Sequence, residues 1–184
     1  MIRIVTDKVK SLRLPSTEVV LPLESRNKRI LDSMLEYLKD TQKPEWREHH
    51  PKAREGVGLA APQIGLNKRM LVISYQSGTE EKPTLIEYEL VNPLIVEESV
   101  KLCFLEAGEG CLSVDEPHPG KVYRPLKVKV KAYNALLGKN VLIDAEGFDA
   151  IVLQHEIDHL NGILFYDHID KINPDKIIPD AVAI

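Results

Sequence analysis

His155-Glu156-Ile157-Asp158-His159 places two imidazoles four residues apart with a carboxylate between them. At this spacing, two helical side chains lie on one face with Cβ atoms about 5–6 Å apart, so both rings can reach one metal ion. The flanking sequence predicts such a helix, because apolar residues surround the motif, Phe148 is placed to act as a hydrophobic staple, and Asn161-Gly162 supplies a left-handed stop. We therefore predict a central helix that carries two metal ligands and a proton carrier.

The third metal ligand is not specified by this helix. The extended metalloprotease pattern requires a histidine where Phe165 stands, and no glutamate follows Glu156 to complete a thermolysin-type site. Asp167, His168 and Asp170 follow the helix stop so closely that we interpret them as solvated loop residues rather than ligands.

An upstream cysteine is the remaining candidate for the third ligand. Cys111 lies in Gly108-Glu109-Gly110-Cys111-Leu112-Ser113-Val114, and it is one of only two cysteines in the chain. A thiolate binds first-row metals strongly, and flanking glycines allow an ion or a substrate to approach the backbone. With His155 and His159 it would form a three-ligand site with an open position. A lone cysteine is otherwise more often a small buried hydrophobe.

A third segment, Gly56-Val57-Gly58-Leu59-Ala60-Ala61-Pro62-Gln63-Ile64-Gly65, is an apolar run punctuated by glycines. It lacks the glycine spacing and the Lys-Ser/Thr ending of a nucleotide-binding loop. The run therefore predicts a packed strand followed by a turn with accessible backbone. Residue type alone favours a surface position for the Gln63 amide.

These three segments resemble the signatures of the peptide deformylase family, which are G-x-G-L-A-A-P-Q, E-G-C-L-S and Q-H-E-x-D-H. They stand in the family order at residues 56–63, 109–113 and 154–159, and the resemblance extends over most of residues 21–170.

The chain looks most like the longer subclass of this family that is typical of Gram-positive-type bacteria. The hydrophilic segment at residues 76–82 and the Gly-Glu-Gly-Cys form of the second motif carry this likeness. The N-terminal pattern D-x-x-P-x-L-R of the family is altered here, because Lys10 stands in place of the proline.

The resemblance implies a hydrolase that removes the N-formyl group from the initiator methionine of nascent polypeptides and releases formate. A divalent ion would make hydroxide available near neutral pH, and Glu156 would carry the proton to the leaving nitrogen. The resemblance assigns hydrogen bonds to the developing oxyanion to the Gln63 side chain and the Leu112 backbone N–H. The metal ligands are then Cys111, His155 and His159.

Substrate recognition is expected to combine backbone pairing with an apolar pocket for methionine. Val57, Gly58 and Gly110 match the family positions that flank the substrate, in a strand-addition mode that gives affinity without reading sequence. Ile151 and Val152 share the ligand helix and either line the pocket or belong to the ordinary core.

The ligands do not identify the metal, because a thiolate with two imidazoles suits Zn²⁺, Fe²⁺, Co²⁺ and Ni²⁺. The resemblance points to Fe²⁺ as the native ion. It also implies that Asp158, which would face away from the ion, pairs with Arg124.

Composition indicates one intracellular enzyme domain. The 184 residues, 43% of them hydrophobic, are enough for one substantial core, so we predict a single catalytic domain over residues 1–184. Two cysteines form no disulfide framework, and neither a signal peptide nor an apolar stretch of membrane-spanning length occurs, so the cytoplasm is expected. A net charge of -4 argues against specific nucleic-acid binding. A transient contact with the ribosome is left open.

The predicted fold is α+β, with mostly antiparallel β-sheets packed around the central metal-ligand helix. We expect Ser25 to cap a helix that ends before Pro44, and a short helix through Trp46 followed by solvated His49 and His50. Lys127, Lys129 and Lys131 alternate with apolar residues and are expected on the wet face of a strand. The predicted strands are residues 70–75, 85–91, 94–100, 127–133 and 141–145, with a turn near Gly138.

Two other functions remain open from the residues alone. A metalloprotease would share the helix motif and would cleave unformylated peptides. A non-enzymatic domain could close a zinc site by adding Cys103 to the other ligands, although seven residues separate Cys103 from Cys111 and Glu156 would then have no role.

Overall fold

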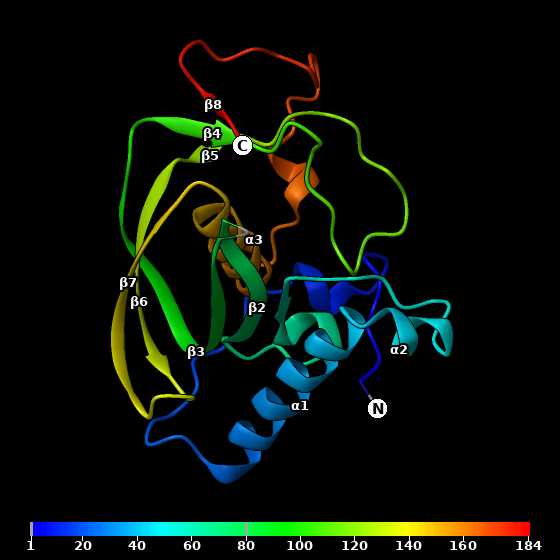
Figure 1. Cartoon of the computed structure of the whole chain (residues 1–184), viewed down its shortest axis with the longest axis vertical. Helices are drawn as coiled ribbons and strands as arrows, with labels where there is room; N and C mark the ends of the chain where they lie inside the picture. The colour runs from blue at the N-terminus through cyan, green and yellow to red at the C-terminus, as the bar shows by residue number, and fades with distance from the viewer. Residues whose placement is uncertain (1, 80) are drawn as a thin grey trace.

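The computed structural model describes residues 2–79 and 81–184, in which helices and strands are mixed in an α+β order (Figure 1). The strands are β1 (Gly58–Ala60), β2 (Met70–Thr79), β3 (Lys82–Glu98), β4 (Leu102–Phe104), β5 (Arg124–Pro125), β6 (Lys127–Asn134), β7 (Lys139–Glu146) and β8 (Val182–Ala183). The α-helices are α1 (Ser25–Thr41), α2 (Pro44–Glu48) and α3 (Phe148–Leu160), and the 3-10 helices are η1 (Lys10–Arg13), η2 (Ala61–Ile64) and η3 (Phe165–His168).

Two sheets form the scaffold. The larger sheet has the order β1-β2-β3-β6-β7 with antiparallel neighbours throughout. The smaller sheet pairs β4 antiparallel with β5 and parallel with β8. Together with the central helix α3, these sheets confirm the predicted α+β class.

Helices α3 and α1 pack on opposite faces of the large sheet. Along β2, Leu71 and Ile73 belong to the core beneath α3, whereas Met70 and Val72 belong to the core beneath α1. This division follows from the two-residue period of a strand, which sends successive side chains to opposite faces. The ligand helix α3 is therefore fixed to the rigid centre of the molecule.

The boundaries of α3 agree with its predicted stop but not with its predicted start. Gly162 has φ +76° directly after the helix, which confirms the left-handed stop. Phe148 is the first helical residue rather than a staple that precedes the helix. Its ring instead contacts Tyr75 edge-on, with centroids 5.3 Å apart.

The N-terminal helices differ from expectation in two details. Ser25 is the first residue of α1 and forms no cap, because Glu24 occupies the N-cap position. The short helix predicted through Trp46 is α2. His50 was expected to be solvated, but its ring is half-buried and stacks on Trp46 at a centroid distance of 3.8 Å. His49 is exposed, as expected.

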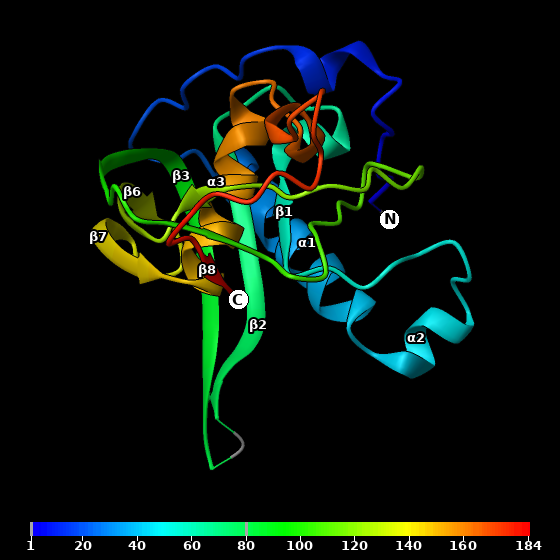
Figure 2. The ribbon, with the colours of Figure 1, turned by 90° about the horizontal axis from the view of Figure 1, so that it is seen from above.

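Residues 76–79 and 82 of the hydrophilic segment extend a hairpin beyond the predicted strands. Strands β2 and β3 pair out to Thr79 and Lys82, and this hairpin projects away from the rest of the molecule (Figure 2). The two strands predicted at residues 85–91 and 94–100 are one strand, β3, whose register shifts at Asn92, where φ is +52°.

The other β-elements follow the predictions more closely. Strands β6 and β7 meet near Gly138, which has φ +64°. The side chains of Val128 and Val130 are buried, while the lysines that alternate with them face outward. Beyond η3, the chain returns to place β8 beside β4, and the Glu106 N–H donates to the Ile184 carbonyl oxygen.

One further property concerns membranes. Among residues 2–79 and 81–184, no helix combines the length and the apolar composition that crossing a bilayer would require.

Candidate active site

Three side chains from two segments form a group that can hold a metal ion. Ligand atoms of Cys111, His155 and His159 all lie within 4.8 Å of one another, and Cys111 Sγ lies 3.3 Å from His159 Nε2. Helix α3 supplies both histidines from one face, and the loop after β4 brings Cys111 to them. A thiolate with two imidazoles fits a divalent first-row ion, which takes bonds of about 2.0–2.3 Å to such donors.

Glu109 orients the first histidine ligand. Its Oε2 lies 2.8 Å from His155 Nδ1, so Nε2 of this ring is left to face Cys111. Arg124 donates to both Glu109 oxygens, from Nε at 2.6 Å and from Nη2 at 3.0 Å. Burial disfavours ionisation of Glu109, but the hydrogen bonds from His155 and Arg124 and the Arg124 charge outweigh burial and lower its pKa to about 2. Glu109 is therefore a permanent carboxylate.

Arg124 also ties the ligand helix to the cysteine loop. Its Nη1 donates to Asp158 Oδ2 at 2.8 Å, which confirms the pairing implied by the family resemblance. Asp158 additionally accepts from His168 at 2.8 Å. The guanidinium is only 3% exposed and therefore holds α3 and the segment of Glu109 in one orientation.

Glu156 occupies a different environment beside the same histidine. It is 4% exposed, and its Oε2 has no hydrogen-bond partner among the described residues. Burial raises the pKa of Glu156 to about 7, although the charges of His155 and Arg124 oppose that shift. A Cβ at Gly58 would lie 2.7 Å from the Glu156 carboxyl carbon, so a larger residue there would displace the Glu156 carboxylate. This carboxylate is poised to exchange a proton near neutral pH.

Gln63 is buried next to Cys111, whereas its residue type favours a position on the surface. Its Oε1 accepts from the Ala60 N–H at 2.8 Å, which leaves Nε2 to face Cys111 Sγ at 3.5 Å and Ser113 Oγ at 3.3 Å. The predicted strand and turn of this segment are β1 and η2. Gln63 thus presents its amide donor to the metal-ligand group.

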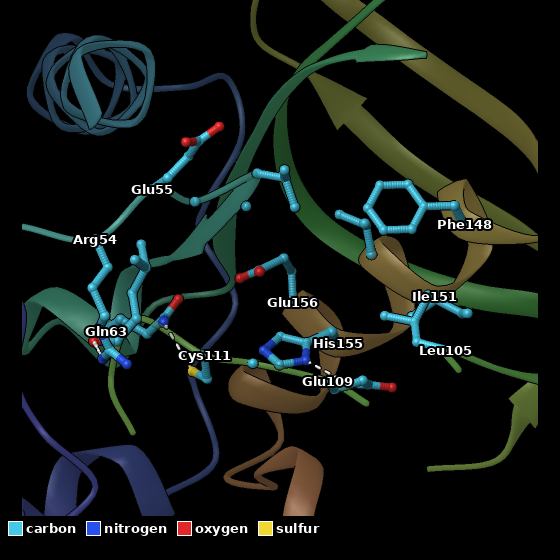
Figure 3. Close-up of a pocket in the computed structure, with 16 residues that line it drawn as sticks. Arg54, Glu55, Gln63, Leu105, Glu109, Cys111, Phe148, Ile151, His155 and Glu156 are labelled. Atoms are coloured by element: carbon cyan, nitrogen blue, oxygen red, sulfur yellow. Dashed lines mark hydrogen bonds and ion pairs between the residues drawn. The ribbon is translucent and has the colours of Figure 1, made fainter. Parts of the chain in front are cut away.

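A cavity of about 350 Å³ opens beside this group. Figure 3 shows Phe148 and Ile151 on one side of Glu156 and His155, and Arg54 and Glu55 on the other. Every residue predicted for the site lines the cavity except His159, which is 1% exposed. The lining residues that were predicted are Val57, Gly58, Gln63, Gly110, Cys111, Leu112, Ile151, Val152, His155 and Glu156.

Six cavity residues were not assigned a role in the site from the sequence, namely Arg54, Glu55, Gly56, Leu105, Glu109 and Phe148. Glu109 could have been found, because it stands in the cysteine motif itself. Phe148 could also have been found, because it precedes Ile151 by three helical positions and so shares its face. No sequence pattern marks Leu105 or Arg54. Arg54 donates to the Leu112 carbonyl oxygen at 2.7 Å and to that of Val114 at 2.8 Å.

The alternative ligands are placed elsewhere. Cys103 is buried near the Pro125 carbonyl and is not part of the metal-ligand group of the described residues, so the closed four-ligand site does not form. Asp167 pairs with Arg13, and Asp170 accepts from backbone N–H groups of its own loop. Within residues 2–79 and 81–184, the group therefore has three members and one open side.

Comparisons with known proteins agree with this geometry. The family model described as polypeptide deformylase matches residues 1–175. The chain is 48% identical over 184 residues to peptide deformylase 2 of Bacillus subtilis (strain 168), which covers 100% of this chain and 97% of that relative.

Solved structures give the same result. A peptide deformylase from Ehrlichia chaffeensis has a TM-score of 0.76 and 32% identity, with 95% of this chain and 90% of that chain covered. A class I type b peptide deformylase from Acinetobacter baumannii with bound Met-Ala-Ser has a TM-score of 0.70 and 31% identity, with 92% and 98% covered.

Proposed function

The chain belongs to the polypeptide deformylase family, and from this membership we propose how its residues remove the formyl group from formyl-methionyl peptides. The observation that carries the proposal is the position of Glu156, which lines the same cavity as Cys111 and His155 and whose Oε2 has no hydrogen-bond partner in the part of the chain that the structure describes. Residues 1–184 act as one catalytic domain in this proposal.

Cys111, His155 and His159 hold one divalent ion. When bound, such an ion would polarise the formyl carbonyl and make water a better nucleophile near neutral pH. Glu109 fixes His155 through Nδ1, and Arg124 fixes Glu109, so the ligand group is supported before an ion arrives.

Glu156 moves the proton in the reaction. It accepts a proton as water attacks the formyl carbon and passes that proton to the peptide nitrogen as the C–N bond breaks. A pKa of about 7 allows Glu156 both to accept the proton from water and to donate it to the peptide nitrogen near neutral pH. The products are formate and a free amino terminus.

Gln63 and Leu112 stabilise the charge that develops on the formyl oxygen. Gln63 Nε2 faces Cys111, and the Leu112 backbone N–H belongs to the residue after Cys111. Donors placed in this way bind an oxyanion more strongly than a neutral carbonyl oxygen. Arg54 holds the Leu112 segment in position through its carbonyl oxygen.

The methionine side chain enters the apolar end of the cavity, formed by Phe148, Ile151 and Val152. The peptide backbone pairs with Val57, Gly58 and Gly110, which also line the cavity. The Met-Ala-Ser peptide bound by the Acinetobacter relative supports this class of ligand.

We further propose Fe²⁺ as the working ion and the cytoplasm as the compartment, because a thiolate ligand and two unpaired cysteines suit reducing conditions. The substrates are nascent chains, so a transient encounter with the ribosome belongs to the proposal. Loading the metal-free protein anaerobically with Fe²⁺, Ni²⁺, Co²⁺ or Zn²⁺ and comparing kcat at equal metal content tests the choice of ion. A higher kcat with Zn²⁺ than with Fe²⁺ would contradict it.

Formate release from formyl-Met-Ala-Ser, with metal analysis of the same sample, tests the function. We expect stoichiometric formate and Met-Ala-Ser, no hydrolysis of acetyl-Met-Ala-Ser, and loss of activity after chelation. Cleavage of internal bonds in unformylated peptides, with no formate from the formylated one, would favour a metalloprotease and overturn the proposal.

A further inference from the structure

A second cavity, of about 860 Å³, adjoins the active-site cavity. Arg54 and Leu112 line both cavities and form the partition between them. Its other walls come from the N-terminal segment at residues 2–6, from α2 and from the loop at residues 50–53. The N-terminal segment and α2 lie on the same side of the molecule in Figure 1.

Residues 54–57, which precede the edge strand β1, lead from the reaction centre toward this second cavity. Strand β1 pairs with β2 on one side only and is the terminal strand of its sheet. Gly58 abuts Glu156, and Leu59 beyond it is buried, whereas Glu55 and Arg54 are exposed. A peptide added along this edge with its formyl end at Glu156 can therefore continue only toward Glu55 and Arg54.

The length of the stretch from Gly58 to Arg54 determines which residues of the substrate peptide reach the second cavity. Arg54 lies four positions before Gly58. An extended chain rises about 3.3 Å per residue, so an extended stretch of four residues spans ~13 Å. The first four residues of a substrate occupy the cleft and the edge, and residues from about the fifth onward reach the second cavity.

Aromatic side chains form one wall of the second cavity. Trp46 stacks on His50 at a centroid distance of 3.8 Å and contacts Tyr37 edge-on at 5.9 Å. All three side chains line the cavity and are half-buried. A half-buried aromatic group of this kind favours an aromatic or large aliphatic ligand side chain.

Basic side chains form the rim. Arg3 and Lys52 are exposed, and neither forms an ion pair with another of the described residues. The acid in the lining, Asp115, lies 3.3 Å from Arg54 and is therefore already paired. The excess positive charge attracts a carboxylate next to the apolar side chain.

We propose that the second cavity binds the downstream part of the substrate peptide and favours an aromatic or large aliphatic residue next to an acidic residue at about the fifth to seventh positions. This inference rests on the proposed deformylase function and extends it to longer peptides. The enzyme would then distinguish nascent chains by residues well beyond the methionine.

Trp46 provides a direct readout, because it is the only tryptophan in the chain and lies in the second cavity. Its fluorescence is recorded while metal-loaded protein is titrated with the unformylated peptide Met-Ala-Ser-Gly-Phe-Asp-Gly-Ser. We expect a saturable change in emission. The same peptide with Lys in place of Asp should bind more weakly, and Met-Ala-Ser should leave the emission unchanged.

Kinetics on the formylated peptides provide the second readout. We expect the KM of the Asp-containing octapeptide to be roughly threefold to fivefold lower than that of the Lys-containing one, the effect expected of a surface charge pair. Lys52→Glu should abolish or reverse this difference. Lys139→Glu is the matched control, because Lys139 is exposed on β7 and lines neither cavity. Formyl-Met-Ala-Ser should give the same kcat and KM in all three proteins.

The outcomes separate the two proposals. Absence of formate release from formyl-Met-Ala-Ser would overturn the proposed function itself. Normal turnover of that tripeptide, with unchanged Trp46 emission and a KM that does not depend on octapeptide sequence, would overturn the second binding cavity alone.

Discussion

Two regions flank His155, and each contains a buried glutamate (Figure 3). The side chain of Glu109 is 3% exposed, and Glu156 as a whole residue is 4% exposed. Glu109 is hydrogen-bonded by both His155 and Arg124, and its pKa lies at about 2. The Oε2 of Glu156 has no hydrogen-bond partner within residues 2–79 and 81–184, and the pKa of Glu156 is about 7. Two buried carboxylates therefore provide a fixed charge in one region and a transferable proton in the other, chiefly because Glu109 has charged hydrogen-bond partners and Glu156 Oε2 has no partner among the described residues.

Among the substitutions that test this comparison, Glu156→Ala should cause the largest change, which is a loss of activity. We expect activity to fall by roughly 10²–10⁴-fold, because one group serves both proton transfers. Metal content should stay near wild type, since Glu156 is not among the three ligands. Formate release and elemental analysis of the same preparation measure both quantities. Wild-type activity at normal metal content would remove Glu156 from the mechanism.

Arg124→Leu should instead disrupt the region of Glu109. It leaves Glu109 and Asp158 as buried charges without their guanidinium, a loss that typically costs about 3–5 kcal/mol. Denaturant unfolding measures this free energy. Arg13→Leu serves as the control, because its pair with Asp167 is exposed and should contribute at most about 1 kcal/mol. Equal stability losses in the two variants would contradict the role of Arg124.

Glu109→Gln is a milder test of the same region. The amide keeps the size of the side chain but removes the charge that orients His155, so we expect metal affinity to fall by about 10–100-fold. At saturating metal, much of the activity should return. Competition with a chromogenic chelator measures the affinity. Full affinity with permanently lost turnover would place Glu109 in the chemistry instead.

Glu89 is a third buried glutamate, and it lies away from the metal site. Its substitution should have the smallest effect, which is a change in the pH dependence of stability. Burial raises its pKa, and Lys28 at 3.0 Å opposes that shift only in part. Because the folded state then binds the proton more tightly than the unfolded state, wild-type stability should fall as pH rises above the unfolded pKa of this acid.

Glu89→Gln lacks this titration. The Tm of the variant minus that of wild type should therefore increase between pH 4.5 and pH 7, and each 1 kcal/mol corresponds to about 2–4 °C for a chain of this size. Glu97→Gln is the control, because Glu97 is exposed on β3. A Tm difference independent of pH for Glu89→Gln would contradict the raised pKa.

Local spacing predicted the parts of the site that depend on one segment. The four-residue interval between His155 and His159 is sufficient to place both rings on one face of α3, and the glycine at position 162 is sufficient to end that helix. The two-residue alternation of β6 likewise predicted which side chains are buried.

Features that depend on distant partners were missed. The burial of Gln63 requires the cysteine loop to pack over η2, and the stacking of His50 requires Trp46 to turn back on it. The length of the hairpin also escaped prediction, because its polar residues pair through the backbone as far as Thr79 and Lys82 and no apolar pattern records that pairing. Periodicity describes one segment at a time, so it was the family resemblance that predicted which separate segments of the chain meet in the site.

The parallel pairing of β8 with β4 has a consequence for how this protein is made. Leu105 lines the active-site cavity and follows β4 directly, and Glu106 is hydrogen-bonded to Ile184. During synthesis, domains fold as the chain emerges, at about 5–20 residues per second. Residues 182–184 leave the ribosome last of those described, several seconds after β4 at these rates. This wall of the cleft can therefore be completed only after residue 184 has left the ribosome, so we expect the cleft to form later than β4 itself emerges.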